Sequence, residues 1–354
     1  MKKISYGQLI LLLFITRIFK TMTYNPFEYV SSINIAFELL ISIAIQCVLI
    51  LPFVYIYKKY PDEDILSLAY KKNKIIGHIT SALYIGFFSI ILYRAVKYFA
   101  VFMSHMFNTL HYTNAITIIL IFSGLYGALM GIESISRSCV FVSAGFCAIF
   151  IIILFTSKSN ADLHNITYMP QTKNIGLVEF VLKAIGYNIE FSALALIMPR
   201  VKNKFTKGVY SYLGIKLILL EVVAYLCVAV LGPYVEICEF PFFKIGAYSK
   251  TQFVQRLDPL YMVEWTLCAV ITVSLYIYLI SASINKMSNK VNSKIVSLIV
   301  SVLLIVVSII VDIERKVTDI WFDKYIGTSL VVLFIFVIPL FLAMISKKKK
   351  KEGA

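Results

Sequence analysis

The chain has 354 residues, of which 60% are hydrophobic and only 15% are charged, and its mean hydropathy is +0.84. Soluble domains carry about 25% charged residues, so this composition excludes an ordinary soluble protein. The formal net charge of +15 does not indicate a nucleic-acid partner, because the lysines and arginines lie between apolar blocks, as in loops that face a cytoplasmic membrane leaflet. We therefore expect an integral, multi-pass membrane protein that binds no nucleic acid.

The apolar blocks have the length of helices that cross a bilayer, which need about 20 residues. The first block follows Lys2 and Lys3 but lacks a small-residue cleavage site, so we expect a retained helix rather than a signal peptide. In chain order the predicted spans are Ile4–Met22, Ile33–Tyr57, His78–Phe107, Thr113–Met130, Cys139–Thr156, Glu179–Met198, Gly208–Leu231, Leu260–Ile284, Ile295–Val311 and Gly327–Ile345. The sequence thus predicts about ten transmembrane helices in a single all-α domain over residues 1–354.

Basic residues alternate between the predicted connections. With a cytoplasmic N-terminus, the connections on that side carry 20 lysines and arginines and the outer connections carry 8. Cytoplasmic loops are enriched in basic residues, so we expect both termini in the cytoplasm, with residues 347–354 as a basic tail beside anionic lipid. A chain of about ten helices can also consist of two inverted halves, here about 4–156 and 179–345.

Ionisable residues inside spans usually face the interior of a helix bundle, because they are costly in lipid. Arg94 and Lys97 lie three residues apart, so we expect them to share one helix face as a cationic stripe that suits a carboxylate ligand or an acidic partner. Other basic residues lie near predicted helix ends, from which long side chains can reach the lipid surface. These are Arg17, Lys20, Lys183 and Lys216.

The sixth predicted span contains residues that weaken a helix. Gly186 and Asn188 lie in its middle, and Gly186 permits the backbone to leave helical geometry where it lines a cavity. In transporters built on inverted repeats, such breaks lie at the substrate. We favour a broken helix here, with a continuous helix that packs closely at Gly186 as the alternative.

Catalytic and nucleotide-binding motifs are absent from the sequence, which has no HExxH, Walker A, GxSxG or dinucleotide fingerprint. No two cysteines have CxxC spacing, and the four histidines lie at or near span ends, so we expect no enzyme, no cofactor and no metal site. Glu133 and Arg137, four residues apart near the inner end of the fourth span, are expected to form a structural ion pair.

Several stretches of the chain are similar to one known family. Residues Gly131–Arg137 match a G-x-E-x-x-x-R segment, and Phe240-Pro241 followed by Gln255–Leu260 and Trp265 is similar to the stretch that leads into the family's eighth helix. The opening residues 4–9 and residues 52–66 are also similar. The chain resembles, nearly end to end, the B subunit of bacterial spore germinant receptors, the GerAB-type spore germination permeases of the amino acid–polyamine–organocation superfamily.

The resemblance implies a LeuT-like fold of two inverted halves with about five helices each. It implies a subunit of the spore inner membrane that partners A-type and C-type receptor subunits, binds a small nutrient, often an amino acid, and signals the start of germination. By analogy, the ligand would lie between the first, third, sixth and eighth helices. The expected ligand-binding residues are Arg17, Tyr93, Arg94, Lys97, Tyr98, Gly186, Asn188, Glu190, Glu264 and Thr266.

The first helix departs from the family pattern. The family usually has a small-residue break there that binds a carboxylate, whereas this chain has Arg17 and Lys20. Either one of these side chains contacts the anion directly, or this member does not bind a free amino acid in the usual way. The alternatives to a receptor subunit are an ion-coupled amino acid or organic-cation transporter, for which the fold is equally suited, and a scaffold subunit with a vestigial site.

Overall fold

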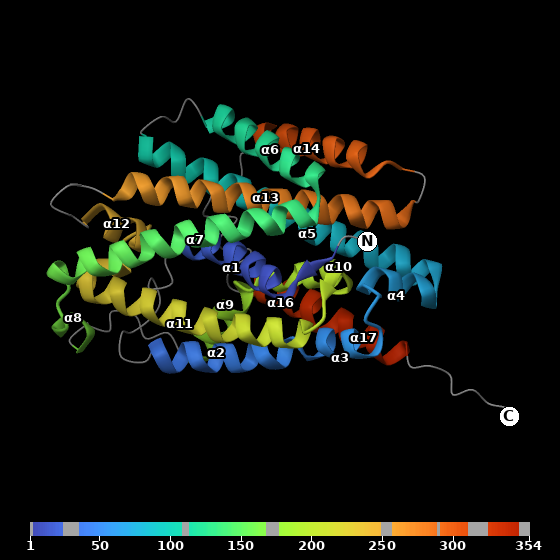
Figure 1. Ribbon diagram of the computed structural model, residues 1–354, viewed down its shortest axis with the longest axis horizontal. Helices are drawn as coiled ribbons and strands as arrows, with labels where there is room; N and C mark the ends of the chain where they lie inside the picture. The colour runs from blue at the N-terminus through green and yellow to red at the C-terminus, as the bar shows by residue number, and fades with distance from the viewer. Residues whose placement is uncertain are drawn as a thin grey trace.

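The computed structural model describes residues 3–23, 35–107, 113–167, 177–248, 257–288, 291–310 and 325–346. Long helices run side by side along the longest axis of the molecule (Figure 1). In this described part of the chain, eight helices are long and apolar enough to cross a membrane, and a bent helix pair would make nine. The chain is therefore an all-α, multi-pass membrane protein, as its composition predicts.

The helices and strands fall into two runs along the chain. The first run is β1 (Ile4–Ser5), α1 (Tyr6–Thr23), α2 (Ile35–Leu49), α3 (Leu51–Lys59), α4 (Ile65–Lys72), α5 (Lys74–Phe107), α6 (Thr113–Met130), α7 (Ile132–Ser157) and α8 (His164–Thr167). The second run is α9 (Leu177–Gly186), α10 (Leu194–Ile197), β2 (Val201–Lys202), α11 (Phe205–Leu231), α12 (Pro241–Tyr248), α13 (Asp258–Met287), α14 (Ser293–Ile310), α16 (Ile326–Val332) and α17 (Ile338–Ile345). Short 3-10 segments flank α10, and a π-helical turn joins α16 to α17.

Helix α1 lies inside the bundle, where it packs against α7, α11 and α13 (Figure 1). It is one continuous helix of 18 residues, so the family's usual break in the first helix is absent from the described residues Tyr6–Thr23. Arg17 and Lys20 lower its hydropathy, and α1 is not among the eight apolar spans. A total of ten spans would require α1 as a further membrane-spanning helix. The total of ten therefore stays a prediction.

Helix α13 is the most buried of the apolar spans and packs on α1, α5, α6, α7 and α14. Its Trp265 is fully buried and stacks on Phe19 of α1 and on Phe99 of α5, with ring centroids 5.5 and 4.9 Å apart. Each such aromatic pair contributes about 0.5–1.5 kcal/mol beyond the burial of its area. Trp265 therefore holds α1 and α5 against α13.

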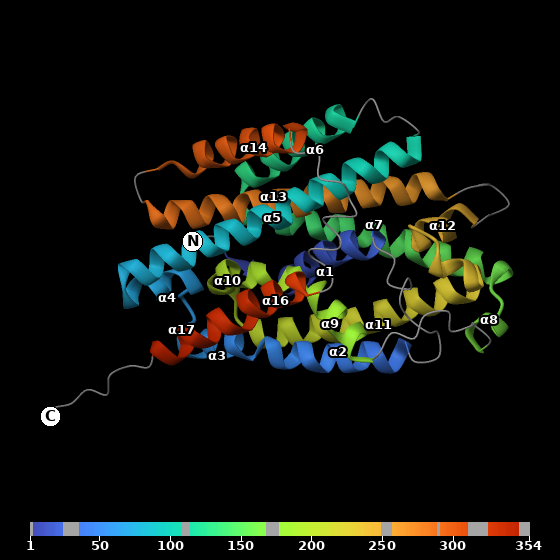
Figure 2. The same cartoon turned by 180° about the vertical axis from the view of Figure 1, so that it is seen from behind.

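One end of the bundle carries α3, α4 and α17, and the opposite end carries α8 and α12 (Figures 1 and 2). At the first end, β1 pairs in parallel with β2, and Tyr60 donates a hydrogen bond to the Ser346 carbonyl after α17. Lys286 at the end of α13 pairs with Asp64, the N-cap of α4. Basic residues also gather at this end: Lys58, Lys59, Lys71, Lys72, Lys74, Lys202, Lys204 and Lys286. The cytoplasmic position of this end stays a prediction, and the predicted tail 347–354 lies outside the described residues.

The turn between α6 and α7 corrects one prediction. Gly131 has a φ of 84°, which a side chain would strain, and it separates the two helices. Helix α7 begins at Ile132 rather than Cys139, so Glu133 and Arg137 lie at the start of the helix predicted as the fifth span and not on the predicted fourth. Hydropathy misplaced the boundary because these first turns are polar. Arg137 donates a hydrogen bond to Glu133 four residues earlier.

Candidate functional site

The sixth span is broken where its sequence predicts. Helix α9 ends at Gly186, and the chain continues past Asn188 into a 3-10 segment that is bent from α9 by 41°. Gly186 is also a close-packing site, because a Cβ there would lie 2.9 Å from the Thr328 Oγ1 of α16. Backbone groups at such a break have lost their helical partners and need others.

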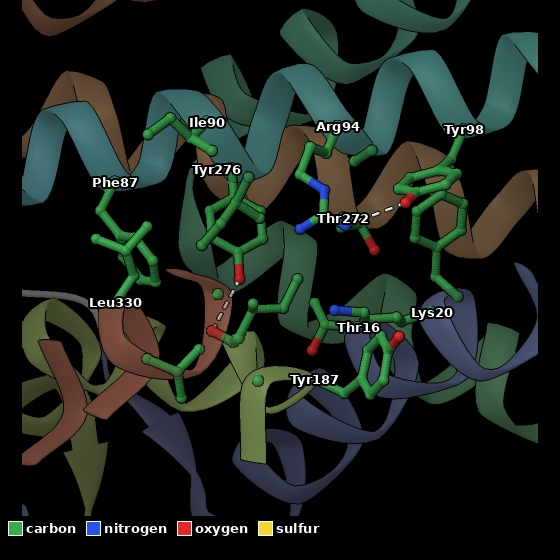
Figure 3. A pocket seen from close by; sticks show the side chains of 17 residues that line it. Thr16, Lys20, Phe87, Ile90, Arg94, Tyr98, Tyr187, Thr272, Tyr276 and Leu330 are labelled. Carbon is green, nitrogen blue, oxygen red and sulfur yellow. Dashed lines mark hydrogen bonds between the residues drawn. The ribbon is translucent and has the colours of Figure 1, made fainter. Parts of the chain in front are cut away.

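Side chains from the protein bind the carbonyl groups at the break. The Arg17 Nη1 of α1 donates to the Tyr187 carbonyl at 3.0 Å. The Tyr276 hydroxyl of α13 donates to the Ile189 carbonyl at 3.2 Å (Figure 3). Asn188 donates its side-chain amide to two carbonyls in the last turn of α9, at 2.8 and 3.1 Å. The break is thus fixed by α1, α13 and its own asparagine.

A buried polar group, here called the Lys216 cluster, adjoins the break and consists of Lys216, Glu190, Asn188, Gln46 and Tyr212. The Lys216 Nζ lies 2.6 Å from Glu190 Oε1 and 2.9 Å from Gln46 Oε1, and it also donates to Asn188 Oδ1. Tyr212 donates to Glu190 Oε1 at 2.9 Å. Glu190 and Lys216 are each 1% exposed. The cluster ties α2, the broken span and α11 together inside the membrane.

The burial of Lys216 contradicts the expectation that it reaches the lipid surface. Helix α11 begins at Phe205, which places Lys216 about 16 Å along the helix at a rise of about 1.5 Å per residue. The sequence did not single out Gln46 or Tyr212. The contact from Lys216 to Gln46 joins positions 170 residues apart, so no local pattern reveals it.

A small cavity of about 50 Å³ also adjoins the break. Its walls come from α1, α5, the broken span, α13 and α16, and most of its lining is apolar, including Phe87, Ile90 and Leu330 (Figure 3). A mostly apolar cavity with a few polar groups is typical of small-molecule sites. The volume is well below the roughly 300 Å³ of ordinary ligand sites, so a nutrient would bind here only if the surrounding helices moved apart.

Two cationic side chains reach into this cavity from different walls, Arg94 from α5 and Lys20 from α1 (Figure 3). The Arg94 Nη2 donates to the Tyr98 hydroxyl at 3.0 Å, and the Lys20 Nζ lies 4.2 Å from the centre of the Tyr187 ring. Among the described residues that line the cavity, none is acidic. The cavity wall therefore contains two positively charged hydrogen-bond donors.

The structure brings part of the predicted set together. Arg94, Tyr98 and Gly186 line the cavity, Asn188 and Glu190 belong to the adjoining Lys216 cluster, and Arg17 contacts the break itself. Lys20, considered as an anion contact from sequence, also lines the cavity.

Tyr93 and Lys97 lie on a neighbouring face of α5 and do not line the cavity. The Lys97 Nζ is 6.0 Å from the centre of the Tyr93 ring. Cavity-lining positions on α5 include Ile91, Arg94 and Tyr98, which follow the three- and four-residue spacing of one helix face. Arg94 and Lys97 therefore do not form the predicted shared stripe toward the cavity.

Glu264 and Thr266 lie on another part of α13. Glu264 is 4% exposed and faces α7, where its Oε2 is 2.8 Å from the position of a Cβ on Gly145. Thr266 donates to the Met262 carbonyl of its own helix at 2.7 Å. Neither lines the cavity; α13 contributes Thr272 and Tyr276 instead. Depth in a span predicts the height of a residue in the membrane but not the face it occupies.

A family model described as spore germination protein matches residues 3–317. Comparison with curated proteins finds no match. The matched range includes the cavity-lining residues of α1, α5, the broken span and α13, and the family comprises permease- or receptor-type membrane proteins rather than a known class of enzyme. The chain belongs to the spore germination protein family, as a GerAB-type germination permease of the amino acid–polyamine–organocation superfamily.

Proposed function

We propose that the protein is the membrane subunit of a spore germinant receptor and that it binds a small nutrient in the cavity beside the broken sixth span. The observation that carries this proposal is the cavity itself, a small apolar space with Arg94 and Lys20 in its walls. Family membership supports a role in germination, and the family's receptor complexes support A-type and C-type subunits as partners in the spore inner membrane.

A ligand in this cavity would touch α1, α5, α13, α16 and the broken span at once. It would therefore stabilise the arrangement of helices that fits it best, and a bound state that differs from the free state is what a receptor needs to signal. The Lys216 cluster would carry part of this change, because Asn188 and Glu190 follow the break directly and Lys216 joins them to α2 and α11.

Spores in which the native gene is deleted and replaced by a copy that encodes either Arg94→Gln or Lys97→Gln test this function. The two substitutions remove a cation from the same helix, but only Arg94 lines the cavity. We expect the Arg94→Gln spores to lose the response to one nutrient, scored by ion release and loss of optical density, whereas the Lys97→Gln spores respond normally. An unchanged response from Arg94→Gln protein present at normal levels in the spore membrane would refute the proposal.

An ion-coupled transporter of amino acids or organic cations is the second candidate. The Lys216 cluster favours it, because charged groups buried inside a membrane bundle often belong to ion pathways. Two cations in the cavity wall make organic cations poor ligands. Uptake of labelled compounds by proteoliposomes separates the two functions, since a receptor binds its nutrient without net transport.

A further inference from the structure

Three buried polar side chains follow one face of α2, and they are here called the α2 polar row. Glu38, Ser42 and Gln46 recur every four residues and are 6%, 2% and 3% exposed. Phe37 and Leu40, which lie on the other side of the helix, are exposed, as expected of residues that face lipid. The α2 polar row therefore faces the protein, where α2 packs on α9 and α11 (Figures 1 and 2).

One end of the α2 polar row joins the Lys216 cluster. Gln46 Nε2 donates to Ser42 Oγ at 3.0 Å, and Gln46 Oε1 accepts from Lys216 Nζ at 2.9 Å. Lys216 donates to three oxygen atoms, those of Gln46, Asn188 and Glu190, which match the three donors of an ammonium group. This end of the row is therefore fixed to a positive charge beside the break.

The other end of the row is Glu38, in the first turn of α2 and far from α3. Its eight-residue separation from Gln46 corresponds to about 12 Å along the helix. Among the described residues, no hydrogen-bond donor reaches the buried Glu38 Oε2, and no cation pairs with the side chain. An ionised carboxylate is costly in such surroundings, whereas the neutral acid is tolerated.

Charged side chains on the helices that pack on α2 are placed elsewhere. On α9, the Lys183 Nζ lies 3.4 Å from Glu179 Oε1. On α11, Lys216 belongs to its cluster, and Glu221 is a second carboxylate that cannot compensate the charge of Glu38. On α3, the basic residues lie in the last turn, at the opposite end of the span; they are Lys58 and Lys59. A metal ion at Glu38 would need several oxygen ligands, whereas a proton needs only one carboxylate oxygen.

We propose that Glu38 is a proton-binding site and that the α2 polar row couples its charge to the Lys216 cluster. Binding of the proton converts the carboxylate into the neutral acid, and its release restores the negative charge. The Lys216 ammonium group attracts that charge through a weakly screening interior. A rearrangement of the cluster at the break therefore changes how tightly Glu38 holds its proton, and proton binding favours one arrangement of the break in return.

This inference goes beyond the proposed function and does not rest on the cavity. It adds a proton to the ligands that the protein senses, and a receptor and a transporter could both use it. The nutrient response of the Arg94→Gln spores and the proton site at Glu38 are therefore tested separately.

Infrared spectroscopy of the purified full-length protein in lipid nanodiscs detects the site, because a protonated carboxylic acid has a C=O stretching band that a carboxylate lacks. We expect a band that disappears as the pH is raised, present in the wild type and absent from Glu38→Gln. Glu133→Gln is the control and should keep the band, because Glu133 is already paired with Arg137. Identical acid bands in the wild type and Glu38→Gln, or a Glu38 band that never changes with pH, would overturn the proposal.

Two variants of the Lys216 cluster test the coupling with opposite signs. At about 12 Å and an effective dielectric constant of about 20, removing the positive charge in Lys216→Met should tighten proton binding at Glu38 about tenfold. The band should then persist to a pH about one unit higher. Glu190→Gln removes a negative charge from the same cluster and should shift the loss of the band to lower pH.

The control for these shifts is Lys71→Met, because the Lys71 side chain is 67% exposed and water screens its charge. It should leave the band unchanged. Either cluster variant decides the point on its own if it folds. An unshifted band in folded Lys216→Met or Glu190→Gln protein, or shifts of the same sign in both, would overturn the coupling.

Discussion

Removing the charge of Lys216 should destabilise the protein strongly, because this side chain is half of a buried ion pair. The Lys216 Nζ is 2.6 Å from Glu190 Oε1, and both side chains are 1% exposed. Lys216→Met keeps most of the side-chain volume but leaves the Glu190 carboxylate buried without its partner. Breaking a buried ion pair in this way costs about 3–5 kcal/mol of the free energy of unfolding.

The expected shift in the thermal midpoint follows from the chain length. At about 2.1 cal/mol/K of unfolding entropy per residue, the 354 residues give about 0.7 kcal/mol/K, so a loss of about 4 kcal/mol lowers the midpoint by about 5 °C. Differential scanning fluorimetry of the purified protein in detergent measures this shift. Glu190→Gln combined with Lys216→Met removes both charges and should recover much of the loss.

Lys97→Met is the matched control, because Lys97 is only half-buried and lies outside the Lys216 cluster. It should change the midpoint by less than about 1 °C, as substitutions away from buried networks usually do. If the thermal midpoint of Lys216→Met equals that of the wild type and of this control, the buried ion pair does not stabilise the break and the reasoning fails.

Three further substitutions test the framework of the site. Gly186→Ala places a Cβ 2.9 Å from Thr328 Oγ1 and should lower the free energy of unfolding by about 1–3 kcal/mol. Gly214→Ala is its control, because a Cβ there meets open space and should not destabilise the protein. Equal thermal midpoints of the two variants would contradict the close packing at Gly186. Asp64→Ala removes the N-cap of α4 and should cost about 1 kcal/mol or more, seen as faster hydrogen exchange in α4, and unchanged exchange would count against it. Glu133→Gln should leave ligand preference unchanged and affect only folding or assembly. The free energy of unfolding should fall by less than about 1 kcal/mol, because Arg137 is largely exposed. A changed ligand choice at normal protein levels would show that the pair is not structural.

Hydropathy predicted the membrane class and most of the long helices, because the need to satisfy the backbone inside lipid acts on each span locally. The break at Gly186 was also predictable, since glycine and asparagine both weaken a helix at that position. The start of α7 was not, because polar residues such as Glu133 and Arg137 lie within its first turns.

The composition of the site was only partly predictable. Arg94 and Lys97 lie within one turn of each other on α5, yet only Arg94 lines the cavity, because the rotation of α5 against α1 and α13 decides which of them faces it. Glu264 has the expected depth but faces α7. The buried position of Lys216 depends on its contacts with Gln46 and Glu190. Contacts between such distant segments cannot be read from the spacing of residues in one sequence.

The most direct measurement is a structure of the purified protein with the nutrient that triggers germination of the wild-type spores. The account predicts ligand density in the cavity between α1, α5 and the broken span, with an anionic group within about 3 Å of the Arg94 guanidinium or the Lys20 ammonium. Density for the nutrient at another place on the protein, with this cavity still enclosing Arg94 and Lys20 but no ligand, would contradict it.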